Sequence, residues 1–573
     1  MGRNGMGETG RWRRLAICGL IAGVLYLPAL GSPALWEPDE GRYAEIAREM
    51  LVSADYITPR DDWVRYFEKP PLMYWATAAS IRALGENEFA LRLPPALFSV
   101  GEVVVTCAIA DQMFGLSAGM LAALALALSP LVWGFAMFLT LDPALAFFVT
   151  AALGSFWAAA AIPGFRSRTA RRWLIAAAAM TAMGTLTKGP VALVIFGGVA
   201  LIYMLIEKRL RELAAIPWFE CILVYAAIVV PWFAAVAALN PEFLGYFFLH
   251  EHLQRYLANT EHGWGPWFLF AVAVAGSWPW LYFVPLGIAR LLGIGRLSGG
   301  RARDARESSA IRFLSMWFLF VLIFFSIPRS KLGTYILPAM PPLAIVAGCG
   351  LSTLAELDRE RLRRLLRWFA IVNVVVAAGC IVALAIGRAA LGSALVLDGT
   401  LAAGCLAIGA AAAFAIGMRG SVRGAIAAIA IAVGFASAAG MKARIDAQPL
   451  VSYRELAKAI RPALESGCVL ASYGHLEQSL PFYAHTREVM VDYLGELGAG
   501  RASPDGAKSF MDKADLPGVW SGSSCVVLVA NRRDYDALAQ ILRPPPAIIA
   551  CEGKKLALYN RPAQGAAANY DCR

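Results

Sequence analysis

Long apolar segments alternate with short polar links along most of this chain. A helix needs about 17–25 apolar residues to cross a bilayer. About thirteen candidate spans can be read, at residues 15–31, 92–112, 117–140, 143–163, 173–187, 189–206, 214–239, 266–289, 313–328, 334–355, 368–387, 396–418 and 424–441. The third is interrupted by Ser129-Pro130, and the fifth and sixth are separated only by Lys188-Gly189. The pattern predicts an all-α polytopic membrane protein with about thirteen transmembrane helices.

The last part of the chain, from about residue 445, follows a different pattern. Helical periodicity over 453–465 is followed by short strand-like segments at 469–472, 489–493, 526–530 and 556–559. Mixed short helices and strands of this kind are typical of a small α/β domain. We therefore expect a membrane domain over residues 1–444, with outer loops at 32–91 and 240–265, and a C-terminal α/β domain over 445–573.

Composition agrees with a membrane protein. Of the 573 residues, 58% are hydrophobic and only 16% are charged, whereas soluble proteins carry about 25% charged residues. The mean hydropathy is +0.57. These values exclude a soluble enzyme and a disordered scaffold. The net charge of +11 lies in short Lys/Arg runs beside apolar segments, as topology signals do, so nucleic-acid binding is not expected.

The distribution of these basic runs orients the spans. Arg11, Arg13 and Arg14 precede the first span, and every second link after it is basic, at 166–172, 208–211, 290–312, 356–367 and 419–423. Basic links stay in the cytoplasm. With an odd number of spans, the N-terminus is expected inside and the C-terminal domain outside, in the bacterial periplasm. The first span has no small-residue cleavage site and is not expected to be a signal peptide.

The ten cysteines divide between the two parts of the chain. Six lie inside apolar segments and are expected to be small core residues: Cys18, Cys107, Cys221, Cys349, Cys380 and Cys405. Four lie in the C-terminal part: Cys468, Cys525, Cys551 and Cys572. One or two disulfides among these four are possible if this part faces an oxidising compartment.

Polar residues that could take part in catalysis or binding lie mainly in the outer segments. Asp39 precedes a short amphipathic helix, predicted by the spacing of Tyr43, Ile46, Ala47 and Met50. Asp39 either caps that helix or acts as an acid that touches a substrate. Asp142 before Pro143 has the same two readings.

Cations gather on the same side. They include Arg42, Lys69, Lys188, Arg255 and Lys331. Lys188 either snorkels to the membrane edge or faces a cavity as a phosphate ligand. Cations at the mouths of several helices suit a lipid-linked phosphate, because they stabilise the charge that grows on it as it leaves.

These residues lie in motifs that resemble the aminoarabinose lipid A transferases, within the protein-O-mannosyltransferase-like group of membrane glycosyltransferases with the GT-C fold. The resemblance covers about the first 340 residues, in order and spacing. Its motifs are Trp36-Glu37-Pro38-Asp39-Glu40-Gly41-Arg42-Tyr43-Ala44-Glu45-Ile46, Arg65-Tyr66-Phe67-Glu68-Lys69-Pro70, Leu141-Asp142-Pro143, Thr187-Lys188-Gly189, Glu251-His252-Leu253-Gln254-Arg255-Tyr256 and Lys331-Leu332-Gly333-Thr334-Tyr335-Ile336-Leu337. The remaining spans and the C-terminal domain match in arrangement only.

The resemblance implies an inverting pentosyltransferase of the inner membrane, acting on the periplasmic side. The donor would be undecaprenyl phosphate carrying 4-amino-4-deoxy-L-arabinose, and the acceptor a phosphate of lipid A. The added cationic sugar would confer resistance to polymyxin and other cationic peptides. The family also implies membrane lipids as partners and a monomeric enzyme without a nucleotide cofactor.

The resemblance also implies roles for single residues. Asp39 and Asp142 match the family's two catalytic acids. Glu68 and His252 match a pair associated with a bound zinc ion, although a closed zinc site needs about four ligands. Residues that match the donor-phosphate site or share its cavity are Arg42, Lys69, Lys188, Arg255, Lys331 and Tyr335. The sequence departs from many relatives at Gly333, where Pro is common, and at Gly41, which is variable.

Two other classes of function remain as alternatives. A related enzyme could use another polyprenyl-phosphate sugar, or a protein or glycan acceptor, because the same cations would bind its donor. A transporter or flippase usually has charges near the middle of the bilayer. Here the middles of the spans consist mainly of Ala, Leu, Val and Phe, which favours surface chemistry over transport or sensing.

Overall fold

The computed structural model describes residues 3–254, 263–294, 305–493, 495–501, 503 and 506–561. The chain forms two compact units, which are described separately. Unit 1 contains residues 1–30, 93–237 and 244–443, and unit 2 contains residues 31–92, 238–243 and 444–573. The first outer loop therefore belongs to the same compact unit as the C-terminal domain.

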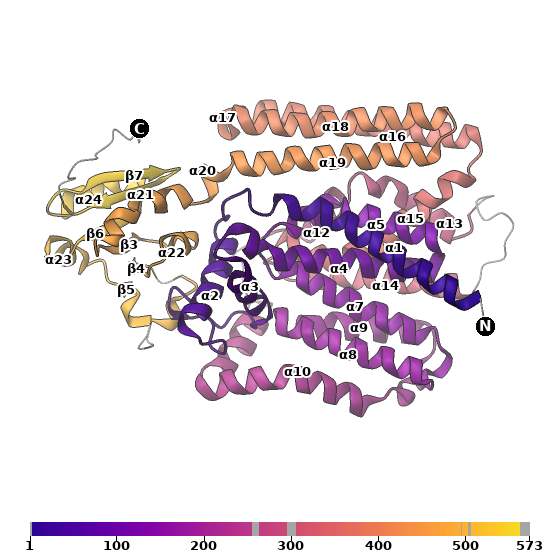
Figure 1. Ribbon diagram of the computed structural model, residues 1–573, viewed down its shortest axis with the longest axis horizontal. Coiled ribbons are helices and arrows are strands. Elements are labelled where there is room, and N and C mark those ends of the chain that lie inside the picture. The colour runs from indigo at the N-terminus through magenta and orange to yellow at the C-terminus, as the bar shows by residue number, and fades with distance from the viewer. Residues whose placement is uncertain are drawn as a thin grey trace. The chain divides into compact units, whose positions relative to one another are not determined.

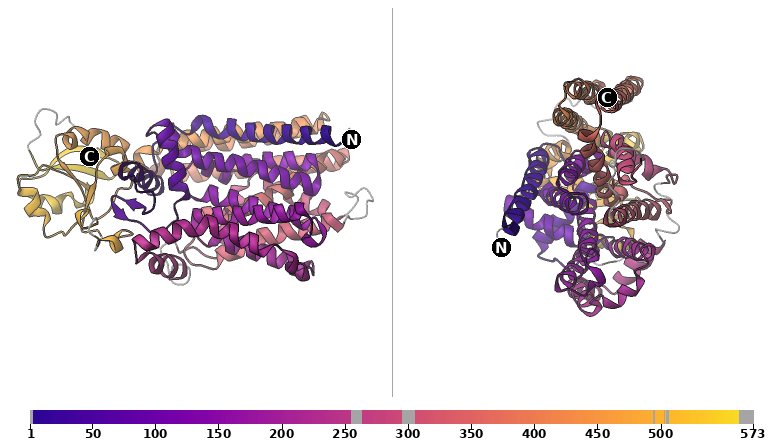
Figure 2. Two further views of the ribbon diagram at one scale, coloured as in Figure 1. Left: turned by 60° about the horizontal axis from the view of Figure 1, so that its bottom comes forward. Right: turned by 90° about the vertical axis from the view of Figure 1, so that its right-hand side faces the viewer.

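Unit 1 is helical, and most of its helices run roughly parallel to one another (Figures 1 and 2). They are α1 (Arg3–Tyr26), α4 (Glu88–Phe114, whose first turn belongs to unit 2), α5 (Leu116–Ala127), α6 (Pro130–Ala136), α7 (Asp142–Ala160), α8 (Arg168–Lys188), α9 (Val191–Ile206), α10 (Trp218–Leu239), α12 (Phe268–Gly276), α13 (Val284–Leu291), α14 (Ala305–Ser326), α15 (Met340–Thr353), α16 (Arg359–Ile386), α17 (Arg388–Leu391), α18 (Ser393–Met418) and α19 (Val422–Asp446, whose end belongs to unit 2).

Shorter turns connect these helices. The 3₁₀ turns are η1 (Leu27–Ala29), η2 (Pro163–Phe165), η3 (Leu210–Ala215), η5 (Trp280–Phe283), η7 (Gly333–Ala339) and η8 (Leu354–Glu356), and η4 (Gly245–Gln254) is a π-helix.

Each apolar segment predicted from the sequence coincides with a helix or with a pair of bent helices. Within the described residues, nine helices are long and apolar enough to cross a membrane, and two bent pairs raise that number to eleven. The all-α membrane architecture is confirmed. The count of thirteen spans stays a prediction, because α9 is shorter than a typical span and α8 does not meet the same criterion.

Prolines mark the two bent pairs. Helices α5 and α6 meet at 63° across Ser129-Pro130, where the sequence predicted an interruption, and the segments flanking Pro279 meet at 92°. Proline cannot donate the backbone hydrogen bond that a continuing helix requires.

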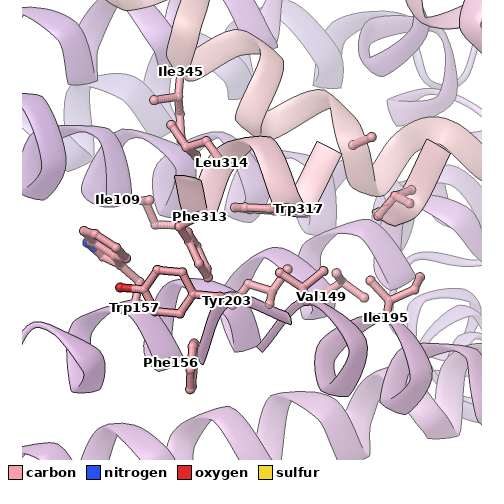
Figure 3. Packing of buried hydrophobic residues seen from close by; sticks show 14 of the residues in the cluster. Ile109, Val149, Phe156, Trp157, Ile195, Tyr203, Phe313, Leu314, Trp317 and Ile345 are labelled. Atoms are coloured by element: carbon pink, nitrogen blue, oxygen red, sulfur yellow. The ribbon is translucent and has the colours of Figure 1, made fainter. Parts of the chain in front are cut away.

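The core of unit 1 is aromatic at one end of α7 (Figure 3). Phe156 and Trp157 of α7 pack against Tyr203 of α9 and Phe313 of α14, with ring centroids 5.2–6.3 Å apart. Helix α7 is almost completely buried. Because α7 is enclosed on all sides, residues at its ends have restricted positions.

The first outer loop supplies the beginning of unit 2. It forms helix α2 (Asp39–Ser53), a short antiparallel hairpin of β1 (Arg60–Asp61) and β2 (Val64–Arg65), and helix α3 (Leu72–Leu84). The predicted helix is confirmed as α2, but its predicted amphipathic character is not. Residues 40 to 50 of α2 are all buried, so the helix is enclosed rather than exposed along one face.

The C-terminal part of unit 2 is the predicted α/β domain. A six-stranded sheet has the order β5-β4-β3-β6-β8-β7, with parallel pairing from β5 to β6 and antiparallel pairing from β6 to β7. Its strands are β3 (Val469–Tyr473), β4 (Glu488–Val491), β5 (Phe510–Met511), β6 (Val526–Asn531), β7 (Ala547–Glu552) and β8 (Lys555–Tyr559).

Short helices surround that sheet within unit 2. They are α20 (Gln448–Val451), α21 (Arg454–Glu465), α22 (Ser479–Ala484), α23 (Leu516–Ser521) and α24 (Tyr535–Ile541), with 3₁₀ turns η9 (Gly498–Gly500), η10 (Gly506–Lys508) and η11 (Arg532–Asp534). The sequence predicted α21 and four of the strands. It missed the two-residue strand β5 and strand β7.

A disulfide joins the starts of two central strands. Cys468 precedes β3 and Cys525 precedes β6, and the two cysteines are bonded across 57 residues of chain. Cys551 is disulfide-bonded as well. All six cysteines of the apolar segments are free, and three of them are buried: Cys18, Cys107 and Cys349. A disulfide among the four cysteines of this part, which the sequence allowed, is therefore present in the structure.

Candidate active site

In unit 1, three of the predicted site residues meet where α7 begins and α8 ends. The Asp142 carboxylate accepts a hydrogen bond from Lys188 Nζ at 2.5 Å and one from Thr140 Oγ1 at 3.2 Å. Lys188 Nζ also lies 4.6 Å from the centre of the Tyr335 ring. Asp142, Lys188 and Tyr335 therefore form one cluster, which we call the α7–α8 cluster.

Local sequence explains why these residues stand at helix ends. Pro143 follows Asp142 in the first turn of α7, where a missing N–H is tolerated. Helix α8 stops because Gly189 adopts a left-handed φ of 80°, which favours glycine. Asp142 is the first residue of α7, and no side chain caps this helix. The capping interpretation of Asp142 is therefore not what the structure shows.

Lys331 lies in the same unit, just before η7. It is buried, and its ammonium donates to the Trp264 carbonyl at 3.0 Å. Burial lowers the pKa of Lys331. A short bridge between Gly263 and Ser330 brings the end of the outer loop at 240–265 beside the link that carries Lys331.

The other part of that outer loop contains two predicted residues. His252 falls in the π-helix η4, whose backbone is described, but its side chain lies outside the described residues. Arg255 also lies outside the described residues. Their predicted roles remain predictions.

In unit 2, Asp39 and Arg42 occupy the first turn of α2. Arg42 Nη1 lies 3.5 Å from Asp39 Oδ1, and Arg42 Nη2 lies 2.5 Å from Glu496 Oε2. Asp39 is 40% exposed, whereas the side chain of Arg42 is only 8% exposed. Helix α2 has no side-chain cap, so Asp39 does not cap it. The buried arginine therefore pairs with two partly exposed acids, Asp39 and Glu496, and Glu496 is 39% exposed.

Glu68 and Lys69 join this group through an aromatic ring. The Arg42 guanidinium lies 5.9 Å from the centre of the Tyr66 ring, and the Tyr66 hydroxyl donates to Glu68 Oε2 at 3.0 Å. Lys69 Nζ lies 3.6 Å from the Glu68 carboxylate. Burial and the Glu68 carboxylate raise the pKa of Tyr66. We call Asp39, Arg42, Tyr66, Glu68 and Lys69 the α2 cluster.

Two members of this neighbourhood were missed as site residues. Tyr66 stands inside the motif of Glu68 and Lys69, in which the sequence assigned roles to these two residues alone, and it links Arg42 to Glu68. Glu496 lies in the C-terminal domain, 454 positions after Arg42 in the sequence, and no sequence pattern marked it. Seven of the sequence-predicted site residues thus fall into two clusters, one in each unit. Lys331 lies outside both clusters, and the side chains of His252 and Arg255 lie outside the described residues.

The described residues offer little support for a zinc site. No group of three or more His, Cys, Asp or Glu side chains in the described part of the chain has the arrangement of a metal site. The Glu68 carboxylate is already engaged by Tyr66 and Lys69. The side chain of His252 lies outside the described residues, so the zinc pair stays a prediction, and no chemical step is derived through a zinc ion.

Two parts of the chain match models of known protein families. Residues 13–247 match the family model for dolichyl-phosphate-mannose-protein mannosyltransferase, and residues 456–560 match the aminoarabinose transferase C-terminal domain. The chain is a homologue of the aminoarabinose transferases. The expected resemblance is thereby confirmed, and the second match extends it to the C-terminal domain.

Individual relatives agree with that assignment. An undecaprenyl phosphate-alpha-4-amino-4-deoxy-L-arabinose arabinosyl transferase of Pseudomonas fluorescens Pf-5 is 34% identical over 66% of this chain and 63% of that protein. One of Pectobacterium carotovorum is 35% identical over 65% of this chain and 64% of that protein. The matches thus span less than two thirds of the length of these relatives.

A solved structure matches over nearly the whole chain. It is ArnT from Cupriavidus metallidurans bound to undecaprenyl phosphate, with a TM-score of 0.84 and 28% identity. The match covers 95% of this chain and 98% of that one. The GT-C architecture and its C-terminal α/β domain are therefore shared along the full length.

Proposed function

We propose that this chain transfers 4-amino-4-deoxy-L-arabinose from undecaprenyl phosphate to a phosphate of lipid A. The observation that carries the proposal is the similarity, over 95% of the chain, to a structure bound to undecaprenyl phosphate. The names of the curated relatives supply the sugar. The acceptor is inferred from the family resemblance and from the cations of the two clusters, which suit phosphate chemistry.

The reaction we infer is a single displacement with inversion. A phosphate oxygen of lipid A forms a bond to C1 of the sugar. The bond between C1 and the oxygen of undecaprenyl phosphate breaks, and its electron pair leaves with that phosphate. The acceptor is already an anion, so it needs little help from a general base. The main task of the enzyme is then to orient the reactants and to stabilise the leaving phosphate.

Each cluster supplies part of that task. In the α2 cluster, Arg42 and Lys69 would bind the donor phosphate, and the accessible Asp39 would orient the acceptor or pair with the ammonium of the sugar. In the α7–α8 cluster, Lys188 and Tyr335 would contact the donor. Asp142 holds Lys188 at 2.5 Å, so a donor phosphate would share this ammonium with a carboxylate. The family resemblance assigns Lys331 and Arg255 to the donor as well.

The proposed location is the bacterial inner membrane. The basic links favour a cytoplasmic N-terminus and a periplasmic C-terminal domain. The Cys468–Cys525 disulfide supports the same orientation, because structural disulfides persist in oxidising compartments such as the periplasm. We keep the boundary near residue 444 between the membrane domain and the periplasmic domain, and we propose that the enzyme acts as a monomer.

The biological consequence follows from charge. Each transferred sugar adds an ammonium to the anionic surface of lipid A, so attraction of cationic peptides such as polymyxin falls. Cells that carry the active protein should therefore tolerate more polymyxin than cells without it.

Mass spectrometry of lipid A tests the proposal. Cells that make the donor but lack their own transferase would express this protein, Asp39→Asn, or Asp512→Asn. Asp512 is 62% exposed and pairs with Arg501, so it serves as a matched surface control. Aminoarabinose on lipid A is expected with the unaltered protein and the control, and not with Asp39→Asn. Unmodified lipid A in the presence of folded protein would instead favour a related enzyme with another sugar or acceptor.

A further inference from the structure

A buried carboxylate in the first turn of α2 binds two arginines from distant parts of the chain. Glu40 is completely buried. Its two carboxylate oxygens accept hydrogen bonds from Arg92 Nε at 2.7 Å and from Arg92 Nη2 at 2.8 Å. A further bond comes from Arg444 Nη2 at 2.7 Å. Arg92 stands near the start of α4 and Arg444 in the last turn of α19, and all three residues belong to unit 2.

Arg92 also binds the segment that leads into α2. Its two terminal nitrogens donate to the carbonyls of Pro33 and Ala34, at 2.6 and 2.9 Å. The side chain of Arg92 is 0% exposed. A bidentate arginine–carboxylate pair fixes orientation as well as charge, because both groups are planar. Arg92 therefore sets the course of the chain into α2 and the rotation of its first turn.

Arg444 adds a second support from another direction. Its guanidinium lies 5.9 Å from the centre of the Trp36 ring. The Trp36 backbone N–H donates to the Glu40 carboxylate at 3.0 Å, and the Glu40 N–H donates to the Trp36 carbonyl at 3.2 Å. The carboxylate of Glu40 thus accepts four hydrogen bonds from three residues. Through these bonds the Glu40 carboxylate connects Trp36, Arg92 of α4 and Arg444 of α19.

The residues on either side of Glu40 belong to the α2 cluster. Asp39 directly precedes it, and Arg42 follows two positions later in the same turn. We propose that Glu40, clamped by Arg92 and Arg444, is a positioning residue that holds Asp39 and Arg42 in their reactive orientation. This inference rests on the proposed function for the roles of Asp39 and Arg42. Glu40 itself touches no substrate and acts through its neighbours.

The same helix provides a matched control. Glu45 is also completely buried, and it accepts hydrogen bonds from Arg48 at 2.7 and 2.5 Å. Both residues stand in α2, so this ion pair lies within one helix. The Glu40 cluster, in contrast, joins three elements. Glu40→Gln and Glu45→Gln therefore remove the same charge from the same helix. Only Glu40→Gln breaks the ion pairs with Arg92 and Arg444, which we call the clamp.

The experiment compares purified full-length variants, with activity expressed per folded molecule. Glu40→Gln is expected to lower kcat by about 100-fold, as misplacement of reacting groups does, and Glu45→Gln by less than about threefold. If Glu40→Gln does not fold, the pair Arg444→Lys and Arg444→Met replaces it. The lysine variant, whose ammonium can still reach the Glu40 carboxylate, is then expected to have a higher kcat than the methionine variant. Equal kcat values within either pair would overturn the inference.

Hydrogen exchange separates this inference from the proposed function. The backbone amides of residues 40 to 43 should exchange faster in Glu40→Gln than in Glu45→Gln, because the clamp has been released. Absence of transfer by the unaltered protein would defeat the proposed function alone. Unchanged exchange in Glu40→Gln would defeat the positioning role, whatever the reaction.

Discussion

Lys188 at the end of α8 and Asp142 at the start of α7 form an ion pair, with Nζ and Oδ1 2.5 Å apart. Both side chains are largely buried, with 14% and 6% of their surfaces exposed. A buried charge without its partner is costly. Each of these residues therefore depends on the other, and their contributions to transfer should not be independent.

A double-mutant cycle tests this dependence. Asp142→Asn and Lys188→Gln are each expected to lower kcat/KM by about 10²–10³-fold, in the range of single groups that stabilise a transition state. The kcat/KM of the double variant should be little lower than that of the less active single variant. The two residues act as one ion pair, and either single substitution already breaks it. Arg312→Gln breaks another ion pair of unit 1, with Glu207, and should leave transfer unchanged. Multiplicative losses in the double variant would mean that the two residues act separately.

Gly41 should tolerate no side chain. A Cβ at this position would lie 2.4 Å from the Ser479 backbone nitrogen, since α2 and α22 approach closely. Gly41→Ala is expected to lower the free energy of unfolding by about 1–3 kcal/mol, as overpacking does. Thermal unfolding of the purified protein measures the effect. Gly518→Ala is the control, because a Cβ there meets no atom within 4 Å, and an equal loss in both variants would contradict the explanation.

The Cys468–Cys525 disulfide should stabilise the C-terminal sheet. It closes a loop across 57 residues, and loss of a disulfide typically costs about 2–4 kcal/mol. The Cys468→Ala/Cys525→Ala variant should unfold at a lower temperature, whereas Cys380→Ala, which removes a free and exposed thiol, should not. Alkylation without reductant should label neither Cys468 nor Cys525 in the unaltered protein. Labelling of both would show that the bond is absent.

Stability should decrease as the pH rises through neutrality. Burial raises the pKa of Asp61 to about 8 and that of Glu37 to about 7, and it raises the pKa of Glu49, Asp62 and Glu488 as well. In the unfolded chain such groups titrate near 4. Between about pH 4 and pH 7–8 the folded state therefore binds more protons than the unfolded state.

Asp61 should therefore lower the free energy of unfolding by about 1.4 kcal/mol per pH unit up to about pH 8, and Glu37 should do so up to about pH 7. The melting temperature is expected to be higher at pH 5.5 than at pH 8.5. Asp61→Asn should show a weaker dependence, because its side chain stays neutral at both values. A melting temperature that increased with pH would contradict the assignment of buried, protonated acids.

Parts of the fold were predictable because their causes are local. The apolar segments produce helices since a chain in lipid must satisfy its backbone hydrogen bonds internally. The break at Ser129-Pro130 and the end of α8 at Gly189 follow from the backbone chemistry of single residues. Strand β5, with two residues, has no local pattern long enough to detect, and β7 was missed.

The candidate site was predictable only as a set of residues. Motifs marked Asp39, Arg42, Glu68 and Lys69 on one side and Asp142, Lys188 and Tyr335 on the other. They did not reveal that Asp142 binds Lys188, that Tyr66 connects Arg42 to Glu68, or that Glu496 contacts Arg42. Such contacts depend on atoms brought within about 4 Å by packing, and residue type alone does not specify them.

The sequence by itself determined the class of protein, the positions of the helices and the α/β character of the C-terminal domain. These properties follow from hydropathy, periodicity and charge, which act over a few turns of chain. Only the tertiary structure decided that Glu40 meets Arg92 and Arg444, residues 52 and 404 positions away. Electrostatic energy depends on distance in space, so ionic partners are chosen by packing and not by separation along the chain.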